Sequence, residues 1–193
     1  MNRNIILSAV MVLMTVMFIA VMPTEAEGAV YEDTVRLHIL AESDSAEDQA
    51  VKIALRDAVL YEFGARLAAA ECAEDARTAL GDTVDEIEDF CKGELSRLGH
   101  SGGVSVSLTE EWYETREYAD FTLPAGVYSS LKIVIGEGDG QNWWCVMYPP
   151  MCLDVACDDD AQDRYTDEER VLISGNGYRA KFKILELISS AFS

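Results

Sequence analysis

Gly136-Glu-Gly-Asp-Gly-Gln-Asn-Trp-Trp-Cys-Val-Met-Tyr-Pro-Pro-Met-Cys152 packs three glycines, two tryptophans, two prolines and two cysteines into seventeen residues. Glycine adopts backbone angles that other residues avoid, so 136–140 predicts an open loop. The apolar run 143–148 is typical of a strand, and the two prolines after it end that strand because proline cannot donate to a ladder. With the apolar run 131–135 before it, the segment predicts strand, loop, strand and rigid turn.

The remaining chain adds helices and further strands around this segment. At 35–39 apolar and polar residues alternate, which is typical of a strand with one buried face. Two long segments follow with apolar residues at steps of three and four, as expected for helices with one buried face, and the second also carries an acidic face. The expected helices are 46–69, 76–98 and 178–188, and a further strand is expected at 104–108.

This order of elements predicts an α+β domain. The expected architecture is a mostly antiparallel sheet packed with two N-terminal helices and a C-terminal helix, preceded by a hydrophobic signal segment. Residues 158–169 are rich in acids and predict an exposed loop, and the character of 171–173 stays open.

The N-terminus is typical of a targeting segment. Arg3 precedes the uncharged run 5–22, which is long for the core of a signal peptide and just long enough to span a bilayer. Small residues at Thr24 and Ala26 suit a cleavage site. We therefore expect residues 1–26 to be a signal peptide, with a retained anchor as the alternative. Residues 27–193 are then one secreted domain that meets the membrane only through 5–22.

Charge limits the partners of this chain. Its 35 acidic and 15 basic residues give a formal net charge of −20. Such a charge repels phosphate backbones and anionic lipid surfaces, so nucleic acid is not an expected partner. It favours solubility or a basic partner.

Four stretches resemble the stage II sporulation protein R family, and the resemblance runs from about residue 31 to the C-terminus. They are Gly136–Cys152, Val35–Ser45 with the following Glu47-Asp-Gln49, Leu123-Pro-Ala-Gly126 and Lys181-Phe-Lys-Ile-Leu-Glu186. No motif of the family matches within 66–103. Proteins of this family are made in the forespore and exported into the space between its two membranes. There they trigger a membrane-embedded aspartic protease of the mother cell, which cleaves the precursor of the first mother-cell sigma factor. The resemblance thus implies a ligand, with no catalytic residue or cofactor of its own.

The candidate partner-binding residues lie in two of these stretches. Gln141, Asn142 and Trp143 follow the glycine loop, where an exposed Trp would suit a protein interface. Alternation along the strand would bury one of the two tryptophans and expose the other, and packing of both in the core is the alternative. Arg36 and His38 share one face of their strand, and a plain surface histidine is the alternative for His38. The glycine loop lacks the dinucleotide fingerprint, and too few carboxylates are grouped to argue a metal site.

The cysteines leave two hypotheses open. Cys145 and Cys152 flank the Pro-Pro turn, so a disulfide between them is expected outside the cytoplasm. Cys72 and Cys91 fall on or next to expected helices and suit small buried groups. The alternative function is a secreted thiol hydrolase acting on cell wall, with Cys145 as nucleophile and His38 or His100 as partner. A nucleophilic cysteine wants a nearby cation or a helix N-terminus, neither of which this sequence motif provides.

Overall fold

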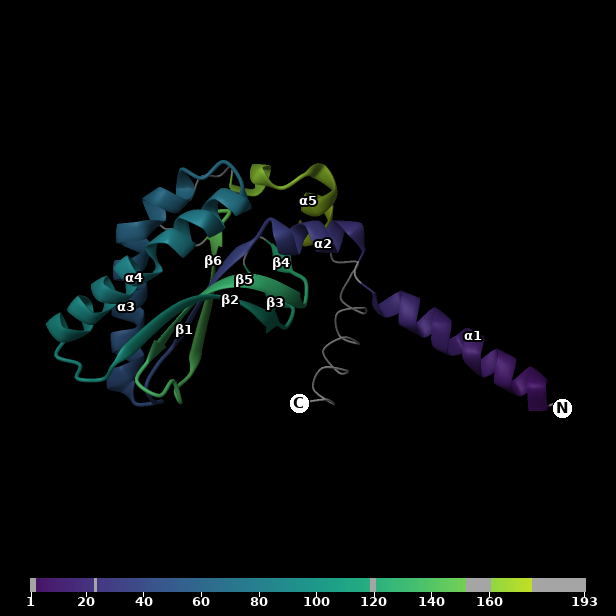
Figure 1. Cartoon of the computed structure of the whole chain (residues 1–193), viewed down its shortest axis with the longest axis horizontal. Coiled ribbons are helices and arrows are strands. Elements are labelled where there is room, and N and C mark those ends of the chain that lie inside the picture. The colour runs from purple at the N-terminus through teal and green to yellow at the C-terminus, as the bar shows by residue number, and fades with distance from the viewer. Residues whose placement is uncertain (1–2, 23, 119–120, 152–160, 175–193) are drawn as a thin grey trace.

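The computed structural model describes residues 3–22, 24–118, 121–151 and 161–174. Figure 1 shows a curved sheet with two long helices along one side and a further helix projecting from the body. The elements, in chain order, are α1 (Arg3–Val21), α2 (Glu25–Glu32), β1 (Val35–Leu40), α3 (Ala46–Ala68), α4 (Ala73–Arg97), β2 (Val104–Tyr113), β3 (Arg116–Glu117), β4 (Thr122–Leu123), β5 (Gly126–Ile135), β6 (Asn142–Tyr148), the 3₁₀ helix η1 (Ala161–Arg164) and α5 (Asp167–Ser174).

The four-stranded sheet has the order β2-β5-β1-β6, and a separate pair joins β3 to β4. β2 pairs antiparallel with β5, and β6 pairs antiparallel with β1. The central pair of β1 and β5 is parallel. The α+β class is therefore confirmed, but the sheet is mixed where a mostly antiparallel one was expected. The cause is that β1 inserts between β5 and β6, so the glycine loop crosses over β1 and does not close a hairpin.

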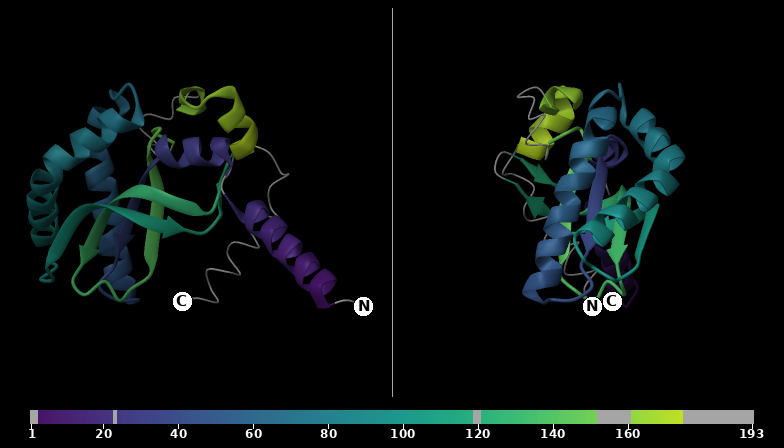
Figure 2. Two further views of the ribbon diagram at one scale, coloured as in Figure 1. Left: turned by 45° about the vertical axis from the view of Figure 1, so that its right-hand side comes forward. Right: turned by 90° about the vertical axis from the view of Figure 1, so that its left-hand side faces the viewer.

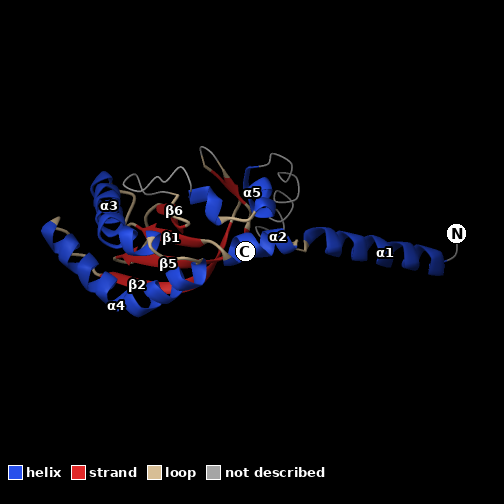
Figure 3. Cartoon of the chain, turned by 90° about the horizontal axis from the view of Figure 1, so that it is seen from above, coloured by secondary structure: helices blue, strands red, loops and turns tan. Residues whose placement is uncertain are grey.

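The helices α3 and α4 cover one face of the sheet, as Figures 2 and 3 show. Their apolar sides pack against the strand residues that alternation directs to this face, for example Leu37 and Ile133. α3 begins where Ser45 accepts a hydrogen bond from the backbone N–H of Asp48, which satisfies one of the free donors of the first turn. Both N-terminal helices expected from the sequence are thus confirmed, at nearly the expected bounds.

The opposite face of the sheet is covered at one end by α2, α5 and the β3–β4 pair. Its core contains Tyr128 and Tyr165, both almost completely buried. α2 carries a capping box in which Thr24 and Glu27 bind each other's backbone N–H. The expected acidic loop at 158–169 is in part helical, because η1 and α5 fall within or overlap it. The expected helix at 178–188 lies outside the described residues.

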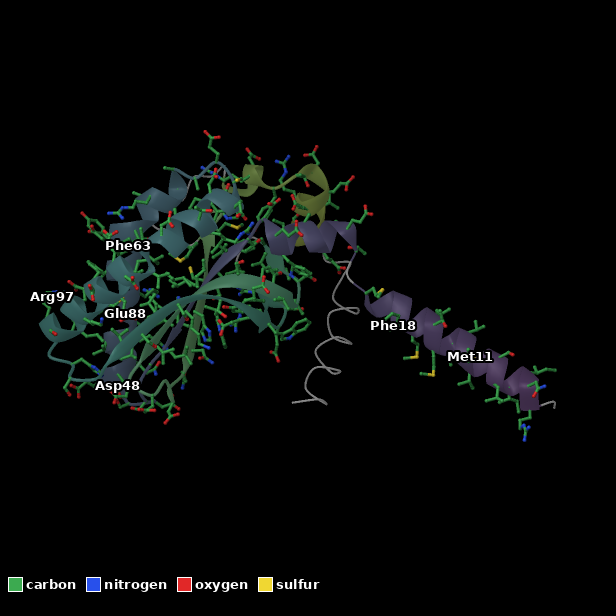
Figure 4. The ribbon with its side chains drawn as sticks, in the orientation of Figure 1. Met11, Phe18, Asp48, Phe63, Glu88 and Arg97 are labelled. Atoms are coloured by element: carbon green, nitrogen blue, oxygen red, sulfur yellow. The ribbon has the colours of Figure 1, made fainter. Side chains whose placement is uncertain are left out.

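The helix α1 covers the hydrophobic run expected to be a signal or an anchor. Its apolar side chains face solvent, as Met11 and Phe18 show in Figure 4. Within the part of the chain that the structure describes, no helix meets both the length and the apolarity needed to cross a membrane. The cleavage site expected after Ala26 falls in the first turn of α2. The signal segment and its cleavage stay predictions.

Candidate partner-binding surface

The two tryptophans of β6 lie on opposite faces of the sheet, and both are half-buried. Trp143 packs against the core beneath the helices, and Trp144 packs against the core of the other face. Each indole is covered by a guanidinium, with Arg56 4.4 Å from the ring centroid of Trp143 and Arg116 4.2 Å from that of Trp144. The expectation of one buried and one exposed Trp is therefore wrong, because these cations cover much of each ring at the end of the sheet.

A groove with a volume of about 1180 Å³ runs between α3 and β6. One wall is the exposed side of α3, and the other is formed by β6 and the β3 region. The groove thus lies beside both tryptophans and the start of β6. Its lining includes Lys52, Arg56, Tyr61, Arg116, Gln141 and Trp143.

The two exposed residues before the tryptophans are held in place by hydrogen bonds. The backbone N–H of Gln141 donates to the carboxylate of Asp44 (2.8 Å), and its carbonyl accepts from the ammonium of Lys52 (2.7 Å). The side-chain oxygen of Asn142 lies 3.0 Å from Nε2 of His38. The sequence analysis named Gln141, Asn142 and Trp143 as a surface, and the structure brings them together at one end of the groove.

Lys52 was not identified from the sequence, yet it is one of the few buried charges among the described residues. Its side chain is only 3% exposed, and its ammonium binds two neutral oxygens, the side-chain oxygen of Gln49 and the carbonyl of Gln141. Burial lowers the pKa of Lys52 below its ordinary value, although the nearby Asp44 opposes this. A lysine on an amphipathic helix is expected on its exposed side, so the sequence did not predict that Lys52 is buried against the carbonyl of Gln141.

His38 belongs to a polar network on the sheet face opposite the helices. Its Nδ1 lies 2.9 Å from the carboxylate of Glu111, which also binds Lys132 at 2.7 Å. Burial alone would raise the pKa of Glu111, but the hydrogen bonds and charges of Lys132 and His38 outweigh it and hold that pKa below its usual range. The partners of His38, Glu111 and Asn142, are both distant from it in the sequence.

Arg36 has no solvent-exposed surface, so the expectation that it contributes to a surface is wrong in this structure. Its guanidinium carbon lies 3.9 Å from the ring centroid of Tyr113 and 5.2 Å from that of Tyr128, and it donates to the hydroxyl of Tyr118 at 3.0 Å. Within the part of the chain that the structure describes, its Nε and Nη1 have no hydrogen-bond partner. Arg36 is buried because α2 and the β3–β4 pair cover this face of the sheet. The alternation of apolar and polar residues in β1 does not reveal that these elements cover the face.

Cys145 and the histidines are not arranged for thiol chemistry. Cys145 pairs with Leu37 across the β1–β6 ladder and packs in the core beneath the helices, whereas the neighbouring His38 points to the other face. Adjacent strand residues point to opposite faces, so no Cys145–His38 pair can form on this sheet. Cys152 lies outside the described residues, so the expected disulfide remains a prediction. Cys91 is buried, and burial raises the pKa of its thiol to about 12.

A second histidine cluster joins the α4–β2 connection to the β1–α3 connection and the first turn of α3, at the end of the sheet that also carries the glycine loop. Nε2 of His100 lies 3.0 Å from the carboxylate of Glu42 and 3.3 Å from that of Asp48. Its Nδ1 accepts a hydrogen bond from the backbone N–H of Gly102, so Nε2 carries the proton and donates to the carboxylates. A metal ion would need Nε2 as a lone-pair donor, but that nitrogen carries a proton. The contacts of His100 with Glu42 and Asp48 are therefore better explained as structural hydrogen bonds. Both carboxylates are distant from His100 in the sequence, since Glu42 follows β1 and Asp48 lies in the first turn of α3.

These features define an α+β domain with a groove between α3 and β6. The family model described as Stage II sporulation protein R (spore_II_R) matches residues 31–157. The chain belongs to the stage II sporulation protein R family, as its sequence motifs predicted. It is 34% identical over 138 residues to Stage II sporulation protein R of Bacillus subtilis (strain 168), which covers 72% of this chain. The matched part spans 62% of that relative, less than two thirds of its length. No solved structure matches this chain.

Proposed function

We propose that this protein is a sporulation signal that is exported from the forespore and activates a membrane-embedded aspartic protease in the facing mother-cell membrane. The activated protease then cleaves the precursor of the first mother-cell sigma factor. Membership of the stage II sporulation protein R family supports a role in sporulation. The structural observation that carries the docking role is the groove beside Gln141, Asn142 and Trp143, with exposed polar groups held rigidly next to two aromatic rings.

The proposed mechanism is a shift in the protease between two states. A ligand changes such an equilibrium only by as much as its affinities for the two states differ. The domain would therefore bind the extracytoplasmic side of the protease more tightly when its catalytic aspartates are in the active arrangement. A preformed surface suits this task, since little binding energy is then lost in ordering Gln141 and Asn142.

The role of a ligand, and not of an enzyme, is supported by how the reactive groups are used. The His38–Glu111 pair has the form that orients a general base, but its Nε2 is held by Asn142, and among the described residues it contacts no nucleophile. Cys145 packs in the opposite core. The catalytic groups of the pathway would then belong to the protease, and no cofactor is needed.

Export is proposed through the hydrophobic N-terminal segment, residues 5–22. Passage of residues 27–193 into the space between the two membranes would place the groove where the protease can reach it. If the chain is cleaved after Ala26, the mature protein is smaller than if α1 is retained as an anchor. The N-terminal sequence of the mature protein separates the two.

The function is tested by reconstitution in a non-sporulating host. The membrane protease and the sigma precursor of the same organism are expressed with and without this chain, and precursor cleavage is followed by immunoblot. We expect cleavage only when the chain is present and exported. Equal cleavage without the chain, or none although all three proteins are present and this one is exported, would contradict the proposed function.

A further inference from the structure

The strand β2 forms the edge of the sheet on the side away from β6. Among the described residues it pairs only with β5, and Figure 3 shows it as the outermost strand beside α4. Its ten residues follow β5 in unbroken register, without a bulge, and they include no lysine and no proline. Natural proteins use lysines, prolines and bulges to keep an edge strand from pairing with another chain. β2 is therefore a long and regular edge that lacks these forms of protection.

One hydrogen bond shows which backbone groups of β2 point outward. The N–H of Val106 donates to the carboxylate of Glu88 on α4 at 3.1 Å, so it points away from β5. In an antiparallel ladder the N–H and C=O of a residue point to the same side, and those of the next residue point to the other. The backbone groups of Leu108, Glu110 and Trp112 therefore also point outward. Across the described residues nothing pairs with them, so they are open to a further strand.

The open part of this edge carries an exposed apolar pair. Trp112 lies directly opposite Val127 of β5, and the two residues are 46% and 47% exposed. Trp112 shares a face of the strand with Val106, which packs in the core beneath the helices. The helices cover Val106 but leave Trp112 and Val127 open to solvent. An apolar side chain on an added strand would pack against Trp112 and extend this pair.

The same part of the edge is acidic. Glu110 and Glu114 lie two residues before and two residues after Trp112, and both are exposed. In the described part of the chain neither forms an ion pair, and the lysine of the neighbouring strand, Lys132, is already bound to Glu111 at 2.7 Å. Opposite charges on neighbouring strands attract, so basic side chains beside Trp112 would meet two carboxylates that have no other cation.

We propose that β2 takes an extended segment of a partner protein, which adds to the sheet as a further strand and has an apolar residue between two basic ones. The backbone of the segment would pair with residues 108–112. Its apolar side chain would pack against Trp112, and its basic side chains, two positions to either side, would meet Glu110 and Glu114. In this mode of recognition main-chain bonds supply affinity and side-chain contacts supply specificity.

Charge selects a basic partner over a second copy of this chain. Two copies each carry a net charge of −20, and pairing of their β2 edges would bring carboxylates such as Glu110 together. The same charge draws a basic segment towards the protein. The inference goes beyond the proposed function, because the groove lies between α3 and β6 and stays free when β2 is occupied.

The test uses the full chain and three synthetic peptides. The first is Thr-Lys-Thr-Val-Thr-Lys-Thr, the second has glutamate in place of both lysines, and the third is the lysine peptide with its backbone amides N-methylated. Binding is followed by the amide chemical shifts of residues 108–112. We expect the lysine peptide to bind at least about tenfold more tightly than the glutamate peptide, with a difference that shrinks in salt. We expect no binding of the N-methylated peptide, although its charge is the same.

Three variants connect this result to β2. Glu110→Lys should weaken binding of the lysine peptide by about tenfold, the usual scale for a lost charge pair. Glu62→Lys makes the same change of charge at an exposed position of α3 and should leave binding unchanged. Trp112→Ala should weaken peptide binding yet leave precursor cleavage unchanged, since Trp112 lies outside the groove.

Three outcomes would overturn the proposal. They are equal binding of the lysine and glutamate peptides, undiminished binding of the N-methylated peptide, and an equal effect of the two lysine substitutions. Dimerisation of the chain through β2 in sedimentation experiments would also overturn it, because a second copy would then occupy the edge. None of these outcomes depends on precursor cleavage, so the proposed function is tested separately.

Discussion

Arg56 of α3 lies over the indole of Trp143 on β6, with 4.4 Å between the guanidinium carbon and the ring centroid. This contact links the helix layer to the edge of the sheet at the mouth of the groove. It places a cation and a large apolar ring at one point, which is the combination that dominates the binding energy of many protein interfaces. The consequences can be measured residue by residue.

Replacement of Trp143 should separate binding from folding. Trp143→Ala removes the ring that borders the groove, and truncation of an interfacial Trp typically costs about 2 kcal/mol or more of binding free energy. We expect a strong loss of precursor cleavage in the reconstituted host, with a folded protein by circular dichroism. Trp112→Ala is the matched control, since Trp112 is 46% exposed and lies outside the groove. Full cleavage with Trp143→Ala would exclude this residue as a contact.

The glycine loop should tolerate no side chain at Gly140. A Cβ there would lie 2.4 Å from the carbonyl oxygen of Ser43, which is backbone and cannot turn away. Gly140→Ala should therefore displace the loop, cost on the order of 1–3 kcal/mol of unfolding free energy and reduce precursor cleavage. At Gly103 no atom lies within 4 Å of such a Cβ, so Gly103→Ala is the control. Equal stability of the two variants in urea would contradict the close approach.

The stability of the protein should fall in acid partly through Glu111. Its pKa is lowered in the folded state, so its contribution is present above the pKa of the unfolded chain and is lost as the pH falls through the folded value. Glu111→Gln should be less stable than the wild type at neutral pH. Between about pH 5 and pH 3 it should lose less stability than the wild type does. Parallel stability curves for the two proteins would show that His38 and Lys132 do not hold this carboxylate ionised.

Arg36 should act inside the fold and not at a partner. Arg36→Ala leaves a cavity between Tyr113 and Tyr128 and should cost roughly 3 kcal/mol of unfolding free energy. Arg36→Met fills the space without a buried charge, and such replacements are often neutral or stabilising. Thermal unfolding of both variants measures these changes in stability. Arg36→Met should also keep full precursor cleavage, and a folded Arg36→Met that fails to trigger cleavage would restore Arg36 as a contact.

The local patterns of the sequence predicted most elements of this fold. Ser45 and the apolar spacing after it marked α3, and the alternation at 35–39 marked the strand β1, but both faces of β1 are buried where one was expected. The pairing of strands was not predictable in this way. The position of β1 between β5 and β6 depends on long-range contacts that no short motif carries.

The site was predicted where its residues are adjacent in sequence. Gln141, Asn142 and Trp143 lie together because they are consecutive, at the end of the glycine loop and the start of β6. The partners of that loop come from elsewhere, since Asp44 follows β1 and Lys52 belongs to α3. Arg36 was misplaced because its burial is caused by a second layer of elements. Charged residues in a strand usually predict an exposed face, and here the tyrosine rings replace solvent around the guanidinium.

Site-directed photo-crosslinking tests the central claim, that this domain docks on the protease through its groove. A photoreactive residue is placed at the exposed position Gln141, and in a control at the exposed position Asp85 of α4, in the host that expresses the protease and the precursor. We predict an adduct with the protease from position 141 and none from position 85. An adduct from position 85 alone, or no adduct from either while precursor cleavage proceeds, would contradict docking through this groove.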